Sequence, residues 1–594
     1  MKQKSYNIIT FIRDIFCYIP LQATAVMIYT TFFALLPAFQ TLAMADFIDT
    51  ATLIFDEKKE MGAILRPLLC IGISMIYQNI MPVINSLVSL SGKNKLRLVI
   101  KPMIIWKQSC LAYHYLESKD SCDLIERVCD NIDEIFWNEY ENLLNGIRLV
   151  INILSLIMIV FRYTLWGGII IIIASIPLFW VASRMGGENY KMEKTSEELK
   201  RKYDYLGEVL IDRNYAQERH LFSYSSFITD KYKKTFNESY KLEKKILCKR
   251  YINMKSGSII TIFIGVIIMA ILLPILKTGK MSSGVYIALV SSVFGLVQAM
   301  SWQMSDSVLA LARLREYLKE YETFLNMEEV DEAGQDPIYN KEFVFQSLEF
   351  CNVSFSYPGT NNFILKNCSF KLTSEKTYAF VGNNGAGKTT ITKLILGLYS
   401  DYEGKILLNG RDIKSYSYAE RKGIIGVAFQ DFAKYQLTID KNVQLGRLYD
   451  YNEKKIREVL DEVGLSEMIS NINDGIYAEL GKLNEQSIDL SEGQWQRLEI
   501  ARLLYSNRAI NILDEPTAAL DPMAETKIYE LFQKIKREHF VIYITHRLGA
   551  ARIADEILVL KDGHIVEKGN HKELVARKNG IYCKMYESQR RWYE

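Results

Sequence analysis

The sequence predicts an α-helical membrane domain followed by a separate α/β domain in one chain of 594 residues. Long apolar stretches fill the first half, and a glycine-rich loop stands between a predicted strand and a predicted helix in the second half. A chain of this length exceeds one ordinary core, so two large units are expected. We place the membrane domain at residues 1–325, an acidic linker at 326–346 with the boundary near Asp336, and the α/β domain at residues 347–594.

Charge and cysteine usage exclude several classes of protein. The net charge is +3, and basic clusters occur mainly between the apolar stretches of the first half. A nucleic-acid-binding protein would carry a sustained basic face, so nucleic acid is not an expected partner. Nine cysteines are scattered without a CxxC pair or a paired-histidine spacing. Neither a zinc site nor a disulfide framework is therefore expected.

Six apolar stretches reach the roughly 20 residues that a helix needs to cross a bilayer. The intervening segments Ser91–Asn142 and Met185–Lys255 are rich in Lys and Arg, which places them on the inner side. Lys2, Lys4 and Arg13 place the N-terminus there too. We expect a multi-pass integral membrane protein in contact with lipid, with its N-terminus and second domain in the cytoplasm. The frequent use of Lys, Ile, Asn and Tyr indicates a bacterium, so the expected membrane is the bacterial cytoplasmic membrane. The predicted spans are 19–45, 64–90, 143–161, 165–183, 258–276 and 285–304.

Helical charge patterning in the inner segments predicts that the membrane helices continue into the cytoplasm. Breaks at Asp130–Phe136 and Leu210–Glu218 are the points where these helices must turn back. Several polar residues lie within or near the spans, where they either line a polar path or bond one helix to another, the commoner case. They are Gln78, Asn79, Asn85, Asn152, Gln298 and Gln303.

The stretches KTYAFV, GNNGAGK and TTITKLILGLY predict a buried strand, a loop and a helix in succession. The loop glycines let the backbone N–H groups converge on a phosphate at the helix N-terminus. Lys388 then reaches the β and γ phosphates, and Thr389 places its hydroxyl on Mg²⁺. We therefore predict a site for ATP and Mg²⁺ rather than a glycine-rich turn without a ligand. Its residues are Gly382, Asn383, Asn384, Gly385, Ala386, Gly387, Lys388, Thr389 and Thr390.

A second predicted strand, in AINILDEP, carries two acidic residues at its end. Asp514 can hold the metal through water, and Glu515 can polarise the water that attacks the γ-phosphate. The sequence thus predicts ATP hydrolysis as well as ATP binding.

Over essentially its whole length, the chain resembles ABC transporters of the exporter type, in which one membrane domain is fused to one ABC-type ATPase domain. The resemblance implies that Tyr357 in FSYPG stacks on adenine and that Gln430 in FQDF touches Mg²⁺. It implies that His546 in ITHR contacts the γ-phosphate. Leu490–Gln494 resembles the family signature and Ala519–Asp521 the D-loop. The expected catalytic residues are Glu515, His546, Gln430 and Lys388, and the expected metal ligands are Thr389, Gln430 and Asp514.

The signature LSEGQ departs from the family pattern at one position. Glu492 stands where the family has glycine, whereas Ser491, Gly493 and Gln494, which are expected to bind the ATP of a second subunit, are retained. A carboxylate near a triphosphate repels it unless the carboxylate points away or finds a cation. We therefore expect an altered but competent site.

The resemblance implies alternating access in an obligate dimer, either a homodimer or a heterodimer. Closure of two ATPase domains on ATP would pass through inner turns, for which Asp130–Phe136 and Leu210–Glu218 are the candidates, and hydrolysis would reset the transporter. The expected function is ATP-driven export of a peptide, a lipid or an amphipathic small molecule, with a peptide or hydrophobic small molecule favoured. An ATP-gated channel, a regulatory subunit and an importer of exporter architecture are the alternatives; an intact Glu515 and His546 argue against a purely regulatory role.

Overall fold

The computed structural model describes residues 5–163, 195–196, 198–340, 342–360, 362–482, 487–516, 522–535 and 539–590, together with the isolated positions 169 and 173. Its contacts divide the chain into two units. The first unit comprises Met1–Trp106 and Asp123–Met327, and the second comprises Lys107–Cys122 and Glu328–Glu594. The chain thus passes into the second unit within the predicted linker, but a short inner segment of the membrane half also belongs to that unit.

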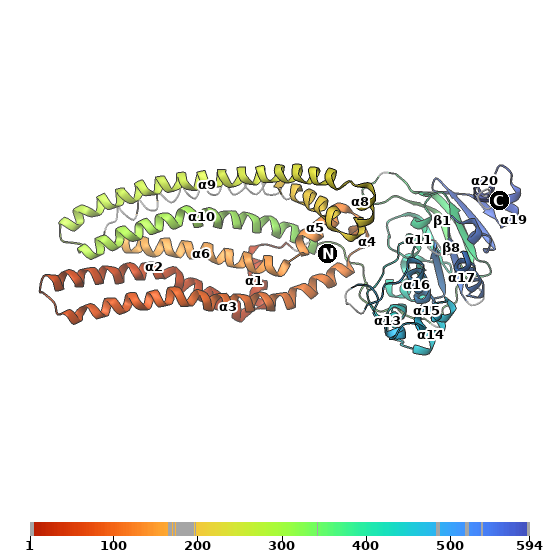
Figure 1. Cartoon of the computed structure of the whole chain (residues 1–594), viewed down its shortest axis with the longest axis horizontal. Coiled ribbons are helices and arrows are strands. Elements are labelled where there is room, and N and C mark those ends of the chain that lie inside the picture. The colour runs from red at the N-terminus through yellow and green to blue at the C-terminus, as the bar shows by residue number, and fades with distance from the viewer. Residues whose placement is uncertain are drawn as a thin grey trace. The chain divides into compact units, whose positions relative to one another are not determined.

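The first unit consists of long helices (Figure 1). Helix α10 packs against α2, α6 and α9, and α2 also packs against α6. Leu156, Leu272, Leu289 and Val293 are among the buried residues of the core between these helices. The elements are α1 (Ile8–Tyr18), α2 (Pro20–Phe55), η1 (Met61–Ile64), α3 (Leu65–Cys110), α5 (Lys119–Cys129), α6 (Ile132–Tyr163), η2 (Arg213–Tyr215), α8 (Ala216–Phe222), α9 (Ser225–Lys277) and α10 (Ser283–Leu325); the ends of α3 and α5 reach into the second unit.

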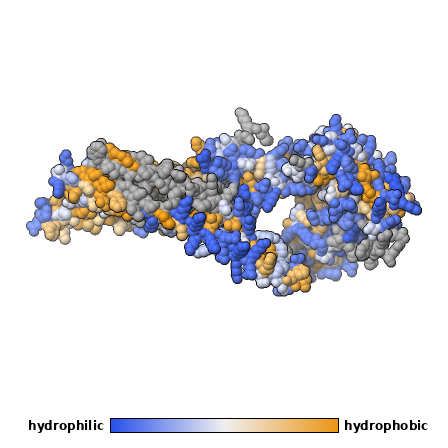
Figure 2. All heavy atoms as spheres, turned by 90° about the horizontal axis from the view of Figure 1, so that it is seen from above, coloured by the Kyte–Doolittle hydropathy of each residue, from blue (hydrophilic) through white to orange (hydrophobic). Residues whose placement is uncertain are grey.

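Among the described residues, three helices are long and apolar enough to cross a membrane, and they cover the first three predicted spans except for the first residue of the first span. These are Pro20–Phe55, Met61–Cys110 and Ile132–Tyr163. Shorter apolar stretches, Gly265–Lys277 in α9 and Ser283–Leu296 in α10, lie where the fifth and sixth spans were expected. Apart from the isolated positions 169 and 173, the predicted fourth span lies outside the described residues. Figure 2 shows apolar residues gathered over the helices of the first unit and mainly hydrophilic residues over the second.

Helix α9 is longer than the hydrocarbon core of a bilayer is thick. Helix α9 has 53 residues, which at 1.5 Å per residue gives a length of about 80 Å, against about 30 Å for the hydrocarbon core. The polar half of α9, beginning at Ser225, therefore continues outside the membrane, as its charge patterning predicts.

The second unit contains two sheets. The first is antiparallel, in the order β2-β1-β4-β5, and the second has the order β10-β9-β3-β8-β7-β6. In the second sheet β3, β6, β7, β8 and β9 run parallel, and β10 is antiparallel to β9. The strands are β1 (Ser347–Phe355), β2 (Leu365–Thr373), β3 (Tyr378–Gly382), β4 (Glu403–Leu408), β5 (Arg411–Asp412), β6 (Ile425–Ala428), β7 (Ile510–Asp514), β8 (Phe540–Ile544), β9 (Glu556–Lys561) and β10 (His564–Gly569).

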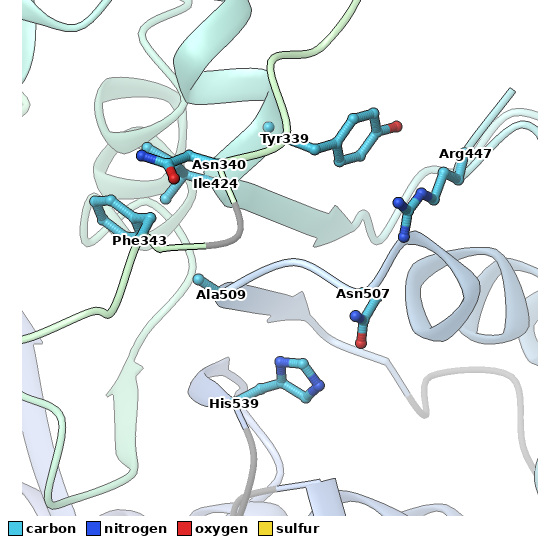
Figure 3. Close-up of a pocket in the computed structure, with 9 residues that line it drawn as sticks. Tyr339, Asn340, Phe343, Ile424, Arg447, Asn507, Ala509 and His539 are labelled. Atoms are coloured by element: carbon cyan, nitrogen blue, oxygen red, sulfur yellow. The ribbon is translucent and has the colours of Figure 1, made fainter. Parts of the chain in front are cut away.

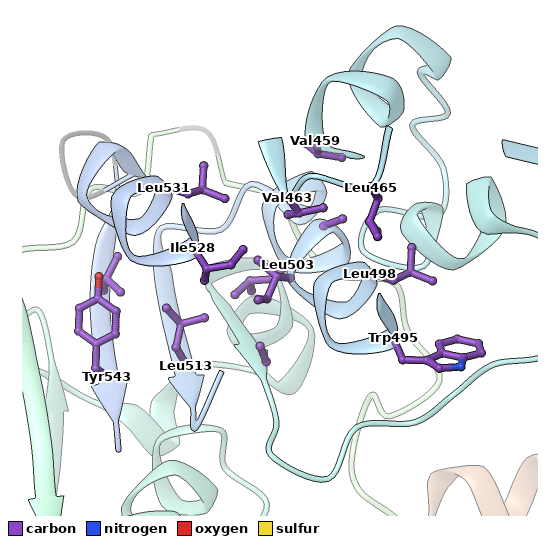
Figure 4. Close-up of a cluster of buried hydrophobic side chains, with 14 of the residues drawn as sticks. Val459, Val463, Leu465, Trp495, Leu498, Leu503, Leu513, Ile528, Leu531 and Tyr543 are labelled. Carbon is purple, nitrogen blue, oxygen red and sulfur yellow. The ribbon is translucent and has the colours of Figure 1, made fainter. Parts of the chain in front are cut away.

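The helices of the second unit cover the parallel sheet and bury two apolar clusters. One cluster lies between the two sheets, and the other joins α14, α16 and α17 to the sheet through residues such as Leu498, Leu513 and Ile528 (Figure 4). The remaining elements are α4 (Tyr113–Glu117), α11 (Lys388–Ile395), η3 (Ile413–Ser415), α12 (Tyr418–Ile424), α13 (Ile439–Gln444), α14 (Glu453–Glu462), α15 (Ser466–Ser470), η4 (Gly475–Tyr477), α16 (Glu492–Ser506), α17 (Pro522–Ile535), α18 (Leu548–Ala551), α19 (His571–Ala576) and α20 (Ile581–Arg590).

The inner segment that belongs to the second unit is Lys107–Cys122, which contains α4. The helical path is interrupted between α3 and α4. There the Ala112 N–H donates to the carbonyl of Glu328 at 3.0 Å. Asp130–Phe136, a candidate coupling turn, lies in the first unit between α5 and α6, and it stays a prediction. Leu210–Glu218 also lies in the first unit.

Candidate ATP-binding and hydrolysis site

Three parallel strands bring the predicted catalytic residues to one edge of the sheet. β3 leads into the glycine-rich loop, β7 ends at Asp514, and β8, which lies between them, leads to His546. Neighbouring parallel strands end at the same edge, so residues that are far apart in sequence meet there. Each of β3, β7 and β8 has five residues, and all of them are buried. This burial explains their nearly continuous apolar sequences.

The loop before α11 depends on glycine at two positions. A Cβ at Gly382 would lie 2.4 Å from the carbonyl oxygen of Leu560, and Gly387, the N-cap of α11, has φ of +105°. Neither position accepts a side chain without strain. The loop tip, at Asn383, Asn384 and Gly385, is exposed, whereas Ala386 is buried. The backbone is thus shaped to approach a ligand at the helix N-terminus.

Lys388 is buried inside this loop. Its Nζ donates to the carbonyl oxygens of Gly382 at 2.7 Å and Asn383 at 3.1 Å. Burial lowers the pKa of the Lys388 amine, while the nearby carboxylates of Glu515 and Asp514 oppose that shift. The ammonium group is therefore held at the centre of the loop, beside the two acidic residues.

Asp514 and Glu515 form a buried acidic pair at the end of β7. Burial first, and the charge of Glu515 next, raise the pKa of Asp514 to about 6, although Lys388 and a hydrogen bond with Thr389 oppose the rise. Two adjacent buried carboxylates favour a bound cation. Groups of three or more His, Cys, Asp or Glu that could hold a metal are absent from the described residues. The hydroxyl of Thr389 and the carboxylate of Asp514 instead fit the oxygen ligands with which Mg²⁺ is held beside phosphates.

Glu515 and His546 lie directly against each other. A carboxylate oxygen of Glu515 is 2.7 Å from Nδ1 of His546. The backbone of Glu515 has φ of +50°, a conformation that costs energy for a residue with a side chain, and its N–H donates to the carbonyl of Ile544 at 2.9 Å. The Nε2 of Gln496 donates to the Glu515 carbonyl at 3.2 Å. The backbone of Glu515 is therefore fixed by hydrogen bonds to β8 and to α16, the helix that begins with the signature.

Tyr357 lies two residues beyond β1, in a cluster of aromatic rings. Its ring meets those of Phe355 and Tyr399 edge-on at centroid distances of 5.2 and 5.5 Å, and its hydroxyl is 3.0 Å from that of Thr390. Thr390 is thus engaged with Tyr357 at the side of the loop. Tyr357 lines a cavity of about 400 Å³ together with α4 residues such as Glu117.

Helix α4 is attached to the helix of the phosphate loop. Glu117 accepts a hydrogen bond from the Tyr399 hydroxyl and pairs with the Nζ of Lys393 at 2.7 Å. The ring of Tyr113 meets that of Tyr399 at 5.7 Å. The inner segment of the membrane half therefore contacts α11 and the aromatic cluster around Tyr357.

Gln430 is exposed just beyond β6. The preceding N–H, of Phe429, donates to a carboxyl oxygen of Glu499 on α16 at 2.8 Å. Burial raises the pKa of Glu499 to about 8. A largely protonated carboxyl group thus connects the segment of Gln430 to the helix of the signature.

The signature begins α16. Ser491 is its N-cap, and a reciprocal capping box joins Ser491 to Gln494, whose side chain accepts from the Ser491 N–H at 2.8 Å. Ser491 and Glu492 are exposed, and Gly493 is partly exposed. The carboxylate of Glu492 lies 2.5 Å from Nζ of Lys434. The acidic residue that departs from the family signature therefore forms an ion pair with a lysine of its own domain.

Sequence reasoning missed Lys434, Gln496 and Glu499 as members of the site, and it missed the segment Lys107–Cys122. Gln496 lies two residues beyond the signature LSEGQ, and its contact with Glu515 depends on how α16 packs against the sheet. The predicted D-loop, Ala519–Asp521, lies outside the described residues.

A separate cavity of about 370 Å³ lies at the opposite edge of the sheet, before β6, β7 and β8. Tyr339 of the linker lines it together with Arg447 and Ala509 (Figure 3). The guanidinium groups of Arg447 and Arg508 lie 4.7 and 4.5 Å from the Tyr339 ring. This cavity is a docking place for the linker and takes no part in the ATP site.

Fold and site together define an ATPase with a nucleotide-binding domain attached to a helical membrane domain. A family model described as "ABC transporter" matches residues 365–518. The chain is 31% identical to the subtilin transport ATP-binding protein SpaT of Bacillus subtilis, over 82% of this chain and 79% of SpaT. It is 28% identical to the nisin transport ATP-binding protein NisT of Lactococcus lactis, over 87% of this chain and 86% of NisT.

More distant similarities agree with these. The chain is 26% identical to the ATP-dependent lipid A-core flippase of Salmonella typhimurium, over 88% of each chain. A bacterial Atm1-family ABC exporter with ATP bound has the same fold, with a TM-score of 0.79 at 21% identity over 96% of this chain and 99% of that one. The chain belongs to the ABC transporter family, as a half-transporter of the exporter type. It is an ATPase whose ATP hydrolysis drives export.

Proposed function

We propose that two copies of this chain form a homodimer in the bacterial cytoplasmic membrane, with six spans each, that exports a hydrophobic peptide. The transport of subtilin and nisin by the relatives SpaT and NisT supports a peptide as the substrate. The N-terminus and the ATPase domain lie in the cytoplasm, because the basic segments between the apolar stretches do.

The observation that carries the hydrolytic part of the proposal is the contact of Glu515 with His546 beside the buried Lys388. Lys388 and the loop from Gly382 to Thr390 bind the phosphates. Asp514, Thr389 and Gln430 would hold Mg²⁺, which when bound supplies positive charge to the phosphates. Glu515 orients the attacking water and accepts its proton, and His546 donates to the γ-phosphate.

The exposed end of α16 supports a site shared between two subunits. Ser491, Gly493 and Gln494 bind the ATP held by the partner, in the manner of the family signature. The pairing of Glu492 with Lys434 supports a homodimer in which both signatures are competent, because the carboxylate no longer faces the phosphates as an unpaired charge.

The test is reconstitution of the purified chain in lipid vesicles. We would measure the mass of the particle, the Mg-ATPase rate, and ATP-dependent accumulation of a dansyl-labelled hydrophobic peptide in inside-out vesicles. The control is Glu515→Gln, for which we expect retained ATP binding with a turnover at least about a hundredfold lower. A monomeric or inactive particle would contradict the homodimer and indicate a missing partner subunit. Peptide flux that only equilibrates would indicate a channel.

A further inference from the structure

A cavity of about 560 Å³ lies inside the first unit, between α2, α3, α6 and α10. Its lining mixes apolar side chains with amides and hydroxyls, and every described residue of the lining is uncharged. Gln40, Ser74, Gln78, Asn152 and Ser292 are among its polar residues. All of them lie in stretches predicted to cross the membrane. Ligand pockets for small molecules have volumes of about 300–1,000 Å³, so the cavity has room for a short peptide segment.

Some of the polar groups bond one helix to another, which holds the cavity in shape. The Nε2 of Gln40 on α2 donates to Oε1 of Gln78 on α3 at 3.0 Å. The hydroxyls of Thr41 on α2 and Ser292 on α10 lie 2.5 Å apart. Two sides of the cavity are therefore fixed by neutral hydrogen bonds of the kind that join membrane helices.

One polar atom of the lining has no such partner. The Oδ1 of Asn152 on α6 is shielded from solvent and accepts no hydrogen bond from the part of the chain that the structure describes. A buried acceptor left unpaired costs free energy that a ligand N–H or O–H group would recover. The Asn152 side chain is half-buried and lines the cavity, so a rotation of its amide group would present this acceptor to a neutral hydrogen-bond donor of a ligand.

The same lining disfavours a charged ligand. Placing an ion in an apolar environment without a counter-ion is strongly unfavourable. Arg148, one helical turn from Asn152 on α6, lies with its guanidinium 5.7 Å from the Phe33 ring and is not part of the lining. A phosphorylated lipid headgroup would thus enter without a paired cation among the described lining residues.

We propose that this cavity binds uncharged hydrogen-bonding groups of the substrate, namely the amide N–H and hydroxyl groups of a hydrophobic peptide, with Asn152 as an acceptor. The inference rests on the proposed function, because it names the class of substrate group that the exporter recognises. The cavity would exclude anionic groups such as phosphates from the bound substrate.

The first experiment uses three photo-leucine tripeptides on the full chain in lipid vesicles. They are N-acetyl-Leu-Ser-Leu-amide, the same peptide with a free carboxylate, and the same peptide with phosphoserine. We expect saturable cross-linking of the neutral peptide to the lining, mapped by mass spectrometry, and at least tenfold less with phosphoserine. Equal labelling by all three, or labelling spread over other helices, would overturn the proposal.

A second experiment fills the cavity. A Cβ at Gly295, which lines it, would meet no atom within 4 Å, so Gly295→Leu extends into open space. Gly72→Leu on α3 is the matched control, since a Cβ there also meets nothing within 4 Å and Gly72 is outside the lining. We expect Gly295→Leu to lower cross-linking at least tenfold and Gly72→Leu to retain it, with both melting temperatures near that of the parent chain. Unchanged cross-linking in Gly295→Leu would refute the site.

A third pair of variants tests the acceptor. Asn152→Leu removes it at similar volume, and Asn79→Leu is the control because its Nδ2 bonds within α3, to the Met75 carbonyl at 2.7 Å, outside the lining. Because Asn152→Leu loses one neutral hydrogen bond, we expect its affinity for the neutral peptide to fall about three- to tenfold, while Asn79→Leu keeps the parent affinity. Equal affinities of the two variants would remove Asn152 from the proposal.

The two levels of proposal fail differently. ATP-dependent peptide accumulation that Gly295→Leu leaves intact would refute the cavity while the export function stands. Specific cross-linking without ATP-dependent accumulation would refute peptide export while the binding site stands.

Discussion

The ammonium of Lys434 lies 2.5 Å from the carboxylate of Glu492, joining the segment after Gln430 to the first turn of the signature helix. Both side chains are about half exposed, so the pair adds little to folding stability, roughly 0.2–1 kcal/mol. Its consequence is electrostatic. It neutralises a carboxylate at the position where, in the proposed homodimer, the signature would meet the ATP of the second subunit.

We therefore expect Lys434→Ala to raise the KM for ATP about three- to tenfold, since the carboxylate then repels the triphosphate. The double variant Lys434→Ala/Glu492→Gly should return to the parent value, because it removes both charges. The measurement is Mg-ATPase activity of the reconstituted dimer across ATP concentrations, analysed as a double-mutant cycle. A Lys434→Ala enzyme with the parent KM would show that Glu492 faces away from the nucleotide.

Gln496 should act through Glu515. Replacing it with Leu removes the donor to the Glu515 carbonyl and leaves a buried acceptor unpaired, at a cost of about 1–3 kcal/mol. If the contact positions Glu515 as the proposed catalytic carboxylate, kcat should fall about tenfold or more while the KM for ATP changes little. Steady-state kinetics separate the two quantities. A loss confined to KM would contradict a positioning role.

Tyr357 should contribute to ATP binding more than to turnover. Stacking of a base on an aromatic ring is worth about 1–3 kcal/mol, so Tyr357→Ala is expected to raise the KM for ATP about tenfold with a smaller change in kcat. Tyr357→Phe keeps the ring and loses only the contact with Thr390, so it should stay near the parent KM. If both variants behave like the parent chain, Tyr357 is a core residue of the aromatic cluster.

Glu499 makes stability depend on pH. Its pKa is raised to about 8 by burial, against about 4.3 in an unfolded chain, so the folded state binds more protons between these values. The free energy of unfolding therefore falls as pH rises through this window. Glu499→Gln imitates the protonated group and should raise the melting temperature more at pH 8.5 than at pH 5.5. Scanning calorimetry at both pH values tests this, and an equal change at both would assign the effect to packing alone.

Glu117 should affect coupling more than hydrolysis. Glu117→Gln weakens the attachment of α4 to Lys393 and Tyr399, so we expect fewer peptides to be transported for each ATP hydrolysed, with the ATPase rate retained to within about twofold. Glu453→Gln is the control, because it breaks an exposed ion pair within α14, with Arg457 at 2.8 Å. A parent-like ratio in Glu117→Gln would mean that this contact only holds the segment in place.

The sequence by itself determined the elements whose causes are local. The strand before the phosphate loop, the helix after it, the acidic strand end at Asp514 and the cap at Ser491 all depend on short-range patterns of apolar, glycine and capping residues. The apolar lengths of the first three spans are likewise local properties of the chain, and the described helices cover them except for the first residue of the first span.

Only the tertiary structure decided which distant residues meet. Lys434 and Glu492 are 58 residues apart, and Gln496 reaches Glu515 because α16 packs on the parallel sheet. Helix α4 belongs to the ATPase unit, where it contacts Lys393 and Tyr399. A lone lysine, glutamine or glutamate carries no pattern that names its partner. Such pairings depend on the packing of whole elements, which satisfies buried polar groups and charges over distances that no sequence window covers.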